Sequence, residues 1–98
     1  MPGPIHRNLV VKHFGTPEVT EGSVNEPRER EEHGMHFNEK WTYRGPVRYP
    51  ADAVERVIYW HRYDYVGSMI RKSKDGDWQT DDELPRVLAA GPAEAGTG

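Results

Sequence analysis

Residues 57–72, VIYWHRYDYVGSMIRK, form the densest run of large apolar and aromatic side chains in the chain. Eight of the first fourteen are β-branched aliphatic or aromatic residues, which fit a pleated, half-buried surface, and no proline interrupts the run. Most of this run is therefore predicted to be strand, and the rest of the fold has to cover it.

Little of the remaining chain is suited to that task. The chain has 98 residues, of which 35% are hydrophobic and 30% are charged, and its 10 glycines and 8 prolines favour disorder further. Large apolar and aromatic residues number 18 between positions 41 and 88, against ten in the first forty. We therefore predict an extended or irregular arm with one short strand over residues 1–37, a small folded domain over 38–90 and a flexible tail over 91–98.

The fold class predicted from these patterns is α+β and β-rich, with one small antiparallel sheet. Its expected strands lie near residues 5–14, 37–43, 64–73 and 77–80. The first of them rests on Leu9, Val10 and Val11, which are consecutive, as is typical of a segment covered on both faces.

A short helix is expected near residues 51–60, and a second short helix near the C-terminus. Pro50 and Asp52 suit the first turn of a helix, and Val54, Val57 and Ile58 share one helical face. The same segment overlaps the β-rich run, so the sequence leaves open whether residues 51–63 are helix or strand.

A hairpin is predicted between the strands near 64–73 and 77–80. Asp75-Gly76 lies between them, and this pair is favoured where a tight turn needs positive φ. Gly67, inside the first of these strands, indicates a β-bulge or a close approach of another backbone segment.

The absence of cysteine excludes disulfides, a thiolate nucleophile and cysteine zinc sites, and it favours a reducing compartment. Residues 1–8 lack the features of a signal peptide, and the longest apolar run is far too short to cross a membrane. A cytoplasmic location without membrane contact is therefore expected.

The net charge of −3 is distributed unevenly. Residues 1–50 carry seven acids and seven bases, residues 51–74 carry +2, and residues 75–98 carry −5. The acidic end disfavours nucleic-acid binding. Arginine beside aromatic residues, as at Trp41 and Arg44, nevertheless resembles stacking platforms for single strands, so a small domain that binds single-stranded nucleic acid is the first alternative function.

Metal binding is the second alternative. His33 and His36 are three positions apart and Glu32 adjoins them, so one helical face could supply three ligands to zinc or a non-haem metal. Gly34 argues against that helix, and a polar turn leading into a strand is the preferred interpretation. No cofactor is predicted. His61 and Asp64 are further acid–base candidates without a supporting motif, so a protein without catalytic activity of its own is preferred over a His-dependent metal enzyme.

The preferred function is a small accessory or structural subunit that binds a larger protein partner, as part of a hetero-oligomeric complex. The chain has many aromatic side chains and few other residues that could bury them, so some are expected to be exposed. Exposed apolar patches generally mark interfaces. Arginine, tyrosine and tryptophan are also enriched at interface centres. The extended arm and an aromatic and arginine-rich surface are expected to make the contact, with six candidate residues: Trp41, Tyr43, Tyr59, Trp60, Arg62 and Tyr63.

Overall fold

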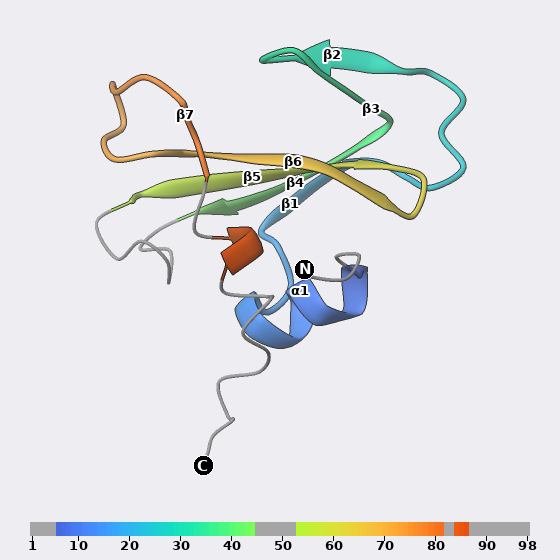
Figure 1. Cartoon of the computed structure of the whole chain (residues 1–98), viewed down its shortest axis with the longest axis horizontal. Helices are drawn as coiled ribbons and strands as arrows, with labels where there is room; N and C mark the ends of the chain where they lie inside the picture. Colours follow the sequence, from blue (N-terminus) through green and yellow to red (C-terminus); the bar gives the residue numbers. More distant parts are fainter. Residues whose placement is uncertain (1–5, 45–52, 82–83, 87–98) are drawn as a thin grey trace.

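A five-stranded antiparallel sheet forms the centre of the protein, in a computed structural model that describes residues 6–44, 53–81 and 84–86. The strand order is β1-β4-β5-β6-β7, and β2 and β3 pair with each other as a separate hairpin (Figure 1). This is the α+β, β-rich architecture expected from the sequence. The elements in chain order are α1 (Arg7–Phe14), β1 (Val19–Gly22), β2 (Arg30–Glu32), β3 (Met35–Phe37), β4 (Glu39–Arg44), β5 (Glu55–His61), β6 (Asp64–Arg71) and β7 (Gln79–Thr80).

The central strand is β5, which replaces the helix predicted near residues 51–60. Residues 51 and 52 of that prediction lie outside the described residues, and residues 55–60 are strand. Five consecutive residues of β5, from Arg56 to Trp60, are buried, because β4 and β6 flank it and both of its faces are covered. A strand covered on both faces loses the alternation of apolar and polar residues, and the spacing of Val54, Val57 and Ile58 then also fits a helix.

The strand predicted near residues 5–14 is wrong, because residues 7–14 form helix α1, while residue 5 lies outside the described residues. Val10 and His13, three positions apart, are its buried residues, whereas Val11 is 39% exposed. The helix ends at Gly15, whose φ of 81° lies in the left-handed region that favours glycine and whose N–H donates to the Val11 carbonyl at 2.7 Å. The run of aliphatic residues thus covers one face of the sheet and is not a strand within it.

The strands predicted near 37–43, 64–73 and 77–80 are confirmed as β4, β6 and β7, and β6 and β7 pair antiparallel as predicted. The tight turn with positive φ predicted at Asp75-Gly76 is wrong, because residues 72–78 connect the two strands and Gly76 does not have positive φ. The bulge expected at Gly67 is confirmed, whereas the group that approaches this glycine closely is a side chain and not another backbone segment. The register of β5 and β6 shifts so that Tyr59 faces Gly67 while Trp60 faces Tyr65, which leaves a bulge in β6. A Cβ at Gly67 would also lie 2.4 Å from the Met35 sulfur, so the hairpin β2–β3 approaches the sheet closely at this glycine.

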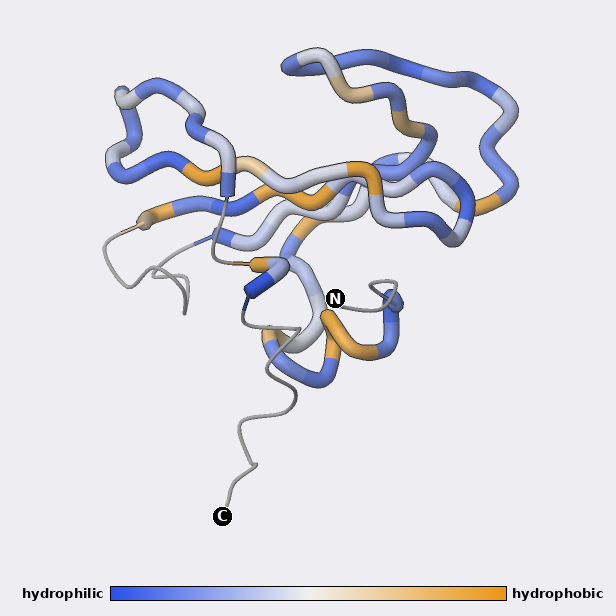
Figure 2. Tube along the Cα trace, in the orientation of Figure 1, coloured by the Kyte–Doolittle hydropathy of each residue, from blue (hydrophilic) through white to orange (hydrophobic). Residues whose placement is uncertain are grey.

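The sheet carries an apolar cluster on each face. Helix α1 lies on one side and the β2–β3 hairpin on the other (Figure 1). Val10 packs with Trp41, Ile58 and Trp60 on the first face. The second cluster contains Phe37, Val57, Tyr59 and Met69. Figure 2 shows hydrophobic residues on α1 and in the strands, whereas the long connection between β1 and β2 is mostly hydrophilic.

The segment predicted as an arm contributes α1, β1, β2 and β3. Strand β1 pairs with β4 from Val19 opposite Thr42 to Gly22 opposite Glu39. The boundary between an arm and a domain near residue 38 stays a prediction. Residues 84–86 form one helical turn, and the rest of the predicted C-terminal helix and tail lies outside the described residues.

Candidate functional site

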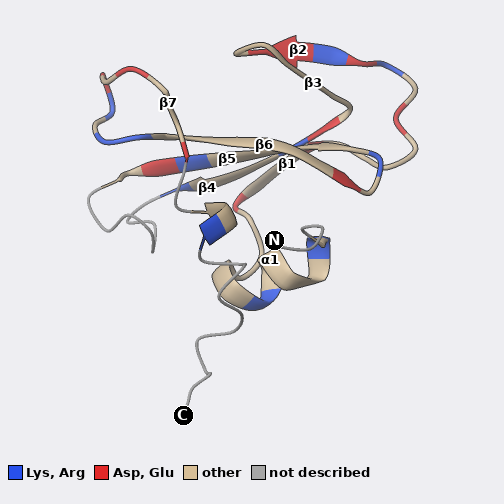
Figure 3. Ribbon diagram, in the orientation of Figure 1, with Lys and Arg blue, Asp and Glu red and all other residues tan. Residues whose placement is uncertain are grey.

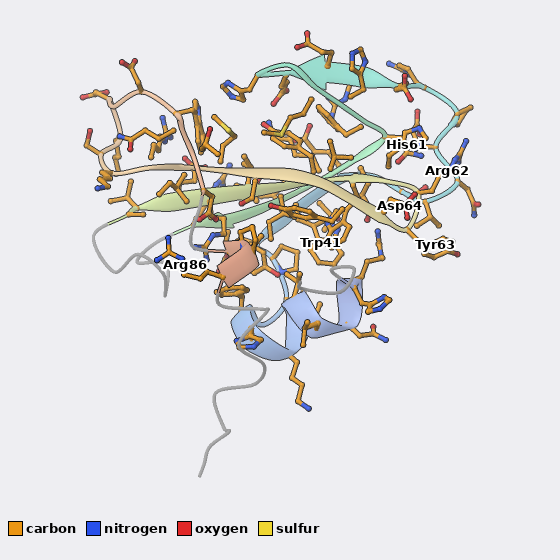
Figure 4. The ribbon with its side chains drawn as sticks, viewed as in Figure 1. Trp41, His61, Arg62, Tyr63, Asp64 and Arg86 are labelled. Carbon is orange, nitrogen blue, oxygen red and sulfur yellow. The ribbon has the colours of Figure 1, made fainter. Side chains whose placement is uncertain are left out.

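The turn between β5 and β6 presents the most exposed aromatic side chain of the described chain. His61 pairs with Asp64, which leaves Arg62 and Tyr63 as a two-residue turn. Tyr63 is 70% exposed. Figure 4 shows it at the outer edge of the molecule, whereas Trp41 lies between the sheet and α1.

The backbone of this turn is strained at Arg62, whose φ is 60°. Of the two central residues only this first one has positive φ, the pattern of a type II′ turn, where glycine is the usual residue. A non-glycine residue in such a conformation costs about 1–3 kcal/mol and persists only where its surroundings hold it.

Three contacts hold Arg62 in place. Its backbone N–H donates to Oδ1 of Asn38 at 2.9 Å, and its carbonyl accepts from Nη1 of Arg7 at 3.4 Å. Its own Nη1 donates to the carbonyl of Val24 at 2.5 Å. Both backbone groups and the side chain are therefore bonded, so the turn is rigid although it is exposed.

Asn38 connects this turn to the rest of the protein. It is buried, and its backbone N–H donates to the Trp60 carbonyl at 3.0 Å. Its Nδ2 donates to the carbonyl of Glu26 at 3.1 Å, so one amide joins the connection between β1 and β2 to the β5–β6 turn. The amide is fully used by the fold, and local sequence gave no signal of this role.

Arg7 fixes the start of α1 beside the same turn. Its guanidinium donates to both carboxylate oxygens of Glu39, at 2.6 and 2.9 Å, in the bidentate geometry that suits arginine. Nε1 of Trp41 donates to the same carboxylate at 2.9 Å. The Arg7 guanidinium also lies 4.9 Å from the centre of a Trp41 ring. Helix α1, the sheet and the turn thus share one polar contact network.

His61 contacts the connection between β1 and β2. Its Nε2 lies 2.7 Å from a carboxylate oxygen of Glu29, and Nδ1 of His36 lies 3.9 Å from the other oxygen. His61 and Asp64, the two acid–base candidates of the sequence, are opposite each other at the ends of β5 and β6. Figure 3 shows acidic and basic residues interspersed along this connection and β2.

Four of the six predicted partner-binding residues are buried inside the protein. Trp41, Tyr43 and Trp60 lie under α1, and Tyr59 lies under the β2–β3 hairpin. Their cover comes from residues 7–14 and 30–37, which the sequence did not place against the sheet. Partner binding stays a prediction, and of the six residues Arg62 and Tyr63 are the exposed ones, with Tyr63 70% exposed.

The three metal-ligand candidates each have different contacts. His33 lies in the β2–β3 turn at a φ of 54°, with its ring 6.1 Å from that of Trp78. His36 is mainly exposed, and its Nδ1 faces Glu29 at 3.9 Å. Glu32 accepts from Nζ of Lys40. Within residues 6–44, 53–81 and 84–86, no three His, Asp or Glu side chains are grouped so as to hold a metal ion.

Glu32, Lys40 and Tyr59 form a polar cluster between β2 and the sheet. The same oxygen of Glu32 accepts from Lys40 Nζ at 2.9 Å and from the Tyr59 hydroxyl at 2.8 Å. Burial acts to raise the pKa of Glu32, but the hydrogen bonds from Lys40 and Tyr59 and the charges of Lys40 and Arg30 outweigh it and lower that pKa. Burial, then the bond to Glu32, raises the pKa of Tyr59. The cluster thus favours an ionised Glu32 and a neutral Tyr59, and it fixes the hairpin to the sheet.

Comparison with protein families, with curated proteins and with solved structures finds no match for this chain. No helix among the described residues is long and apolar enough to cross a membrane.

Proposed function

We propose that the protein is a small accessory subunit that binds a larger protein partner and has no catalytic activity of its own. The observation that carries the proposal is the 70% exposure of Tyr63 on a turn that is held rigid by the fold. Tyrosine is one of the residues enriched at interface hot spots, so an exposed tyrosine at a defined position suits an interface.

The rigidity of the turn supports binding in particular. A tyrosine side chain has few rotatable bonds, and its backbone here is already fixed, so little conformational entropy is lost when a partner covers it. The backbone strain at Arg62 also supports a binding role for the turn, because strained backbone is retained mainly where function requires a particular geometry.

The proposed contact surface extends from the turn onto the neighbouring part of the arm. The connection between β1 and β2 is bonded to the turn through Val24, Asn38 and Glu29. A partner that covers Tyr63 would therefore also meet this connection, as the proposal of an arm that contributes to binding requires.

A protein partner is favoured over a single-stranded nucleic acid. Stacking platforms present several exposed rings along a basic groove. Among the described residues Tyr63 is the one aromatic residue that is largely exposed, and Trp41 is packed against Trp60 at a centroid distance of 5.0 Å. The charges next to Tyr63 are also mixed, since Arg62 precedes it and Asp64 follows it.

The test is affinity purification of the full chain from its native host, with partners identified by mass spectrometry. The dissociation constant is then measured with the purified partner. We expect Tyr63→Ala to weaken binding by roughly thirtyfold or more, since loss of a central interface ring costs about 2 kcal/mol or more. Its thermal stability should stay close to that of the wild type, because the side chain is exposed.

Val11→Ala is the matched control, because Val11 is the other exposed large apolar residue among those described and lies on α1. It should leave the affinity unchanged. A well-folded monomer that brings no associate from its host would contradict the proposal, and so would a partner that binds Tyr63→Ala as tightly as the wild type.

A further inference from the structure

A polar hollow lies beside the β1–β2 connection, separate from the Tyr63 side chain. It has a volume of about 190 Å³, below the roughly 300–1,000 Å³ that is usual for sites of drug-sized ligands. Its lining consists of Glu21, Gly22, Glu26, Arg28, Arg30 and Asn38. A hollow of this size suits a small molecule and not a nucleotide or a large cofactor.

The floor of the hollow is formed by closely packed backbone, which leaves no space for a side chain at Gly22. Gly22 has a φ of 76°, and a Cβ there would lie 2.1 Å from the carbonyl oxygen of Asn38. The buried Asn38 amide is bonded to the Glu26 carbonyl and to the N–H of Arg62. This floor is therefore rigid, and the charged side chains form the walls.

The walls carry two positive and two negative charges, and each arginine faces a glutamate at a long distance. Nη2 of Arg30 is 3.4 Å from Glu21, and Nε of Arg28 is 3.9 Å from Glu26. A tight charge-assisted hydrogen bond is about 2.7–2.9 Å long. Both ion pairs are therefore weak. A ligand that carries a positive and a negative group can replace each of them with shorter hydrogen bonds to the arginines and glutamates.

The two arginines differ in freedom. The guanidinium of Arg30 lies over the Phe37 ring at 5.0 Å, which orients it. The Arg28 side chain is 80% exposed, so its fork of N–H donors is available to a carboxylate. The walls have no net charge, which disfavours a phosphate or a polyamine and favours a neutral molecule that carries both signs.

We infer that this hollow binds the zwitterionic head of a free α-amino acid. Its carboxylate accepts from Arg28 and Arg30, and its ammonium group donates to Glu21 and Glu26. No apolar side chain lines the hollow, so a small or polar amino acid fits better than an aliphatic one. The inference does not rest on the proposed function, although Glu26 and Arg28 belong to the connection that a partner at Tyr63 would also meet.

The experiment is a titration of the full-length ¹⁵N-labelled chain with glycine and with L-glutamine, followed by amide NMR shifts. We expect saturable shifts at Glu21, Gly22 and Arg28 with a dissociation constant in the millimolar range, as a few polar contacts to so small a ligand allow. Acetate and methylammonium, which each carry one of the two charges, should bind at least about tenfold more weakly, because each forms half of the contacts.

Two variants locate the site. Arg28→Gln should weaken glycine binding about tenfold, since it removes a charge-assisted bond, and it should leave the unfolding temperature unchanged because the side chain is exposed. Arg44→Gln is the matched control, because Arg44 is 63% exposed and does not line the hollow. An absence of saturation, equal binding of acetate alone, or equal binding by Arg28→Gln and the wild type would each overturn the inference.

Discussion

The buried ion pair between Arg56 and Asp81 offers a direct test of what holds β5, β6 and the chain after β7 together. The two side chains are 1% and 0% exposed, and Nε of Arg56 donates to Oδ2 of Asp81 at 2.6 Å. The same oxygen accepts from the Ser68 hydroxyl at 2.8 Å, and Oδ1 accepts from the N–H of Leu84 at 3.2 Å. Asp81 is thus the acceptor for three segments.

Asp81→Ala leaves the Arg56 guanidinium buried without its counter-charge. One of its nitrogens, Nη2, already lacks a hydrogen-bond partner, and the group lies over the Phe14 ring at 4.6 Å, where water has little access. Breaking a buried pair on one side typically costs about 3–5 kcal/mol. Small domains are stable by only about 5–15 kcal/mol, so the variant should lose at least about a fifth of its stability.

Equilibrium unfolding in urea, followed by tryptophan fluorescence, measures this loss. With a denaturant slope of about 1.5 kcal/mol per molar, the urea midpoint should fall by roughly 2–3 M. Trp60 is fully buried and reports the unfolding of the sheet. Ser68→Ala removes one neutral donor to the same carboxylate and should cost about 1 kcal/mol.

The double variant Arg56→Met with Asp81→Ala distinguishes two causes of the lost stability. One is the buried, unpaired charge of Arg56, and the other is the loss of the contacts that Asp81 makes. The double variant leaves no charge buried, so its stability should recover to within about 2 kcal/mol of the wild type. A single variant within about 1 kcal/mol of the wild type, or a double variant as unstable as the single one, would refute this reasoning.

Two further predictions concern backbone and pH. Gly22→Ala should destabilise the protein far more than Gly15→Ala in thermal unfolding, because both have positive φ but only the Cβ at position 22 meets backbone, at 2.1 Å; equal losses would contradict the packing at β1. Burial raises the pKa of Tyr43 and of Tyr59 above the usual 10.0, so their contribution to stability is complete below that pH and is lost as pH rises through the folded pKa values. Urea titrations from about pH 9 upward should show stability falling in the wild type and falling less in Tyr59→Phe.

The parts of the fold that the sequence predicted correctly are those in which local pattern and local pairing agree. Strand β4 alternates buried rings with polar residues, and β6 and β7 are joined by a connection that contains Asp75-Gly76. Gly67 marked the bulge in β6, because glycine inside a strand often lies at a bulge. These features depend on neighbours close in sequence, whereas the contact of Met35 with Gly67 joins residues far apart.

The errors have the opposite origin. Strand β5 was partly assigned to a helix because its cover comes from both faces, and α1 was assigned to a strand because three aliphatic residues in a row do not show which of them face a core. Gly15 and the basic residues before it were available as helix-end signals. The burial of Trp41 and Trp60 depends on contacts with α1, far away in sequence.

Site prediction shows the same division. Arg62 and Tyr63 were named from composition, but nothing local distinguished the exposed Tyr63 from the buried Tyr59 four positions earlier. The role of Asn38 and the hollow beside it require β1, β4 and the β5–β6 turn to be placed together. Such features follow from tertiary register and not from periodicity.

The order of the strands has a consequence for how the chain acquires its fold during synthesis. Strand β1 pairs with β4, with Val19 opposite Thr42, and α1 packs on residues of β4 and β5 that are translated later still. When α1 and β1 leave the ribosome, the surfaces that will cover them do not yet exist. Contacts between distant parts of a chain form slowly because a long loop must close first. Strands β4, β5 and β6 pair with their neighbours in sequence. The N-terminal segments therefore stay exposed to solvent until these three strands have been synthesised.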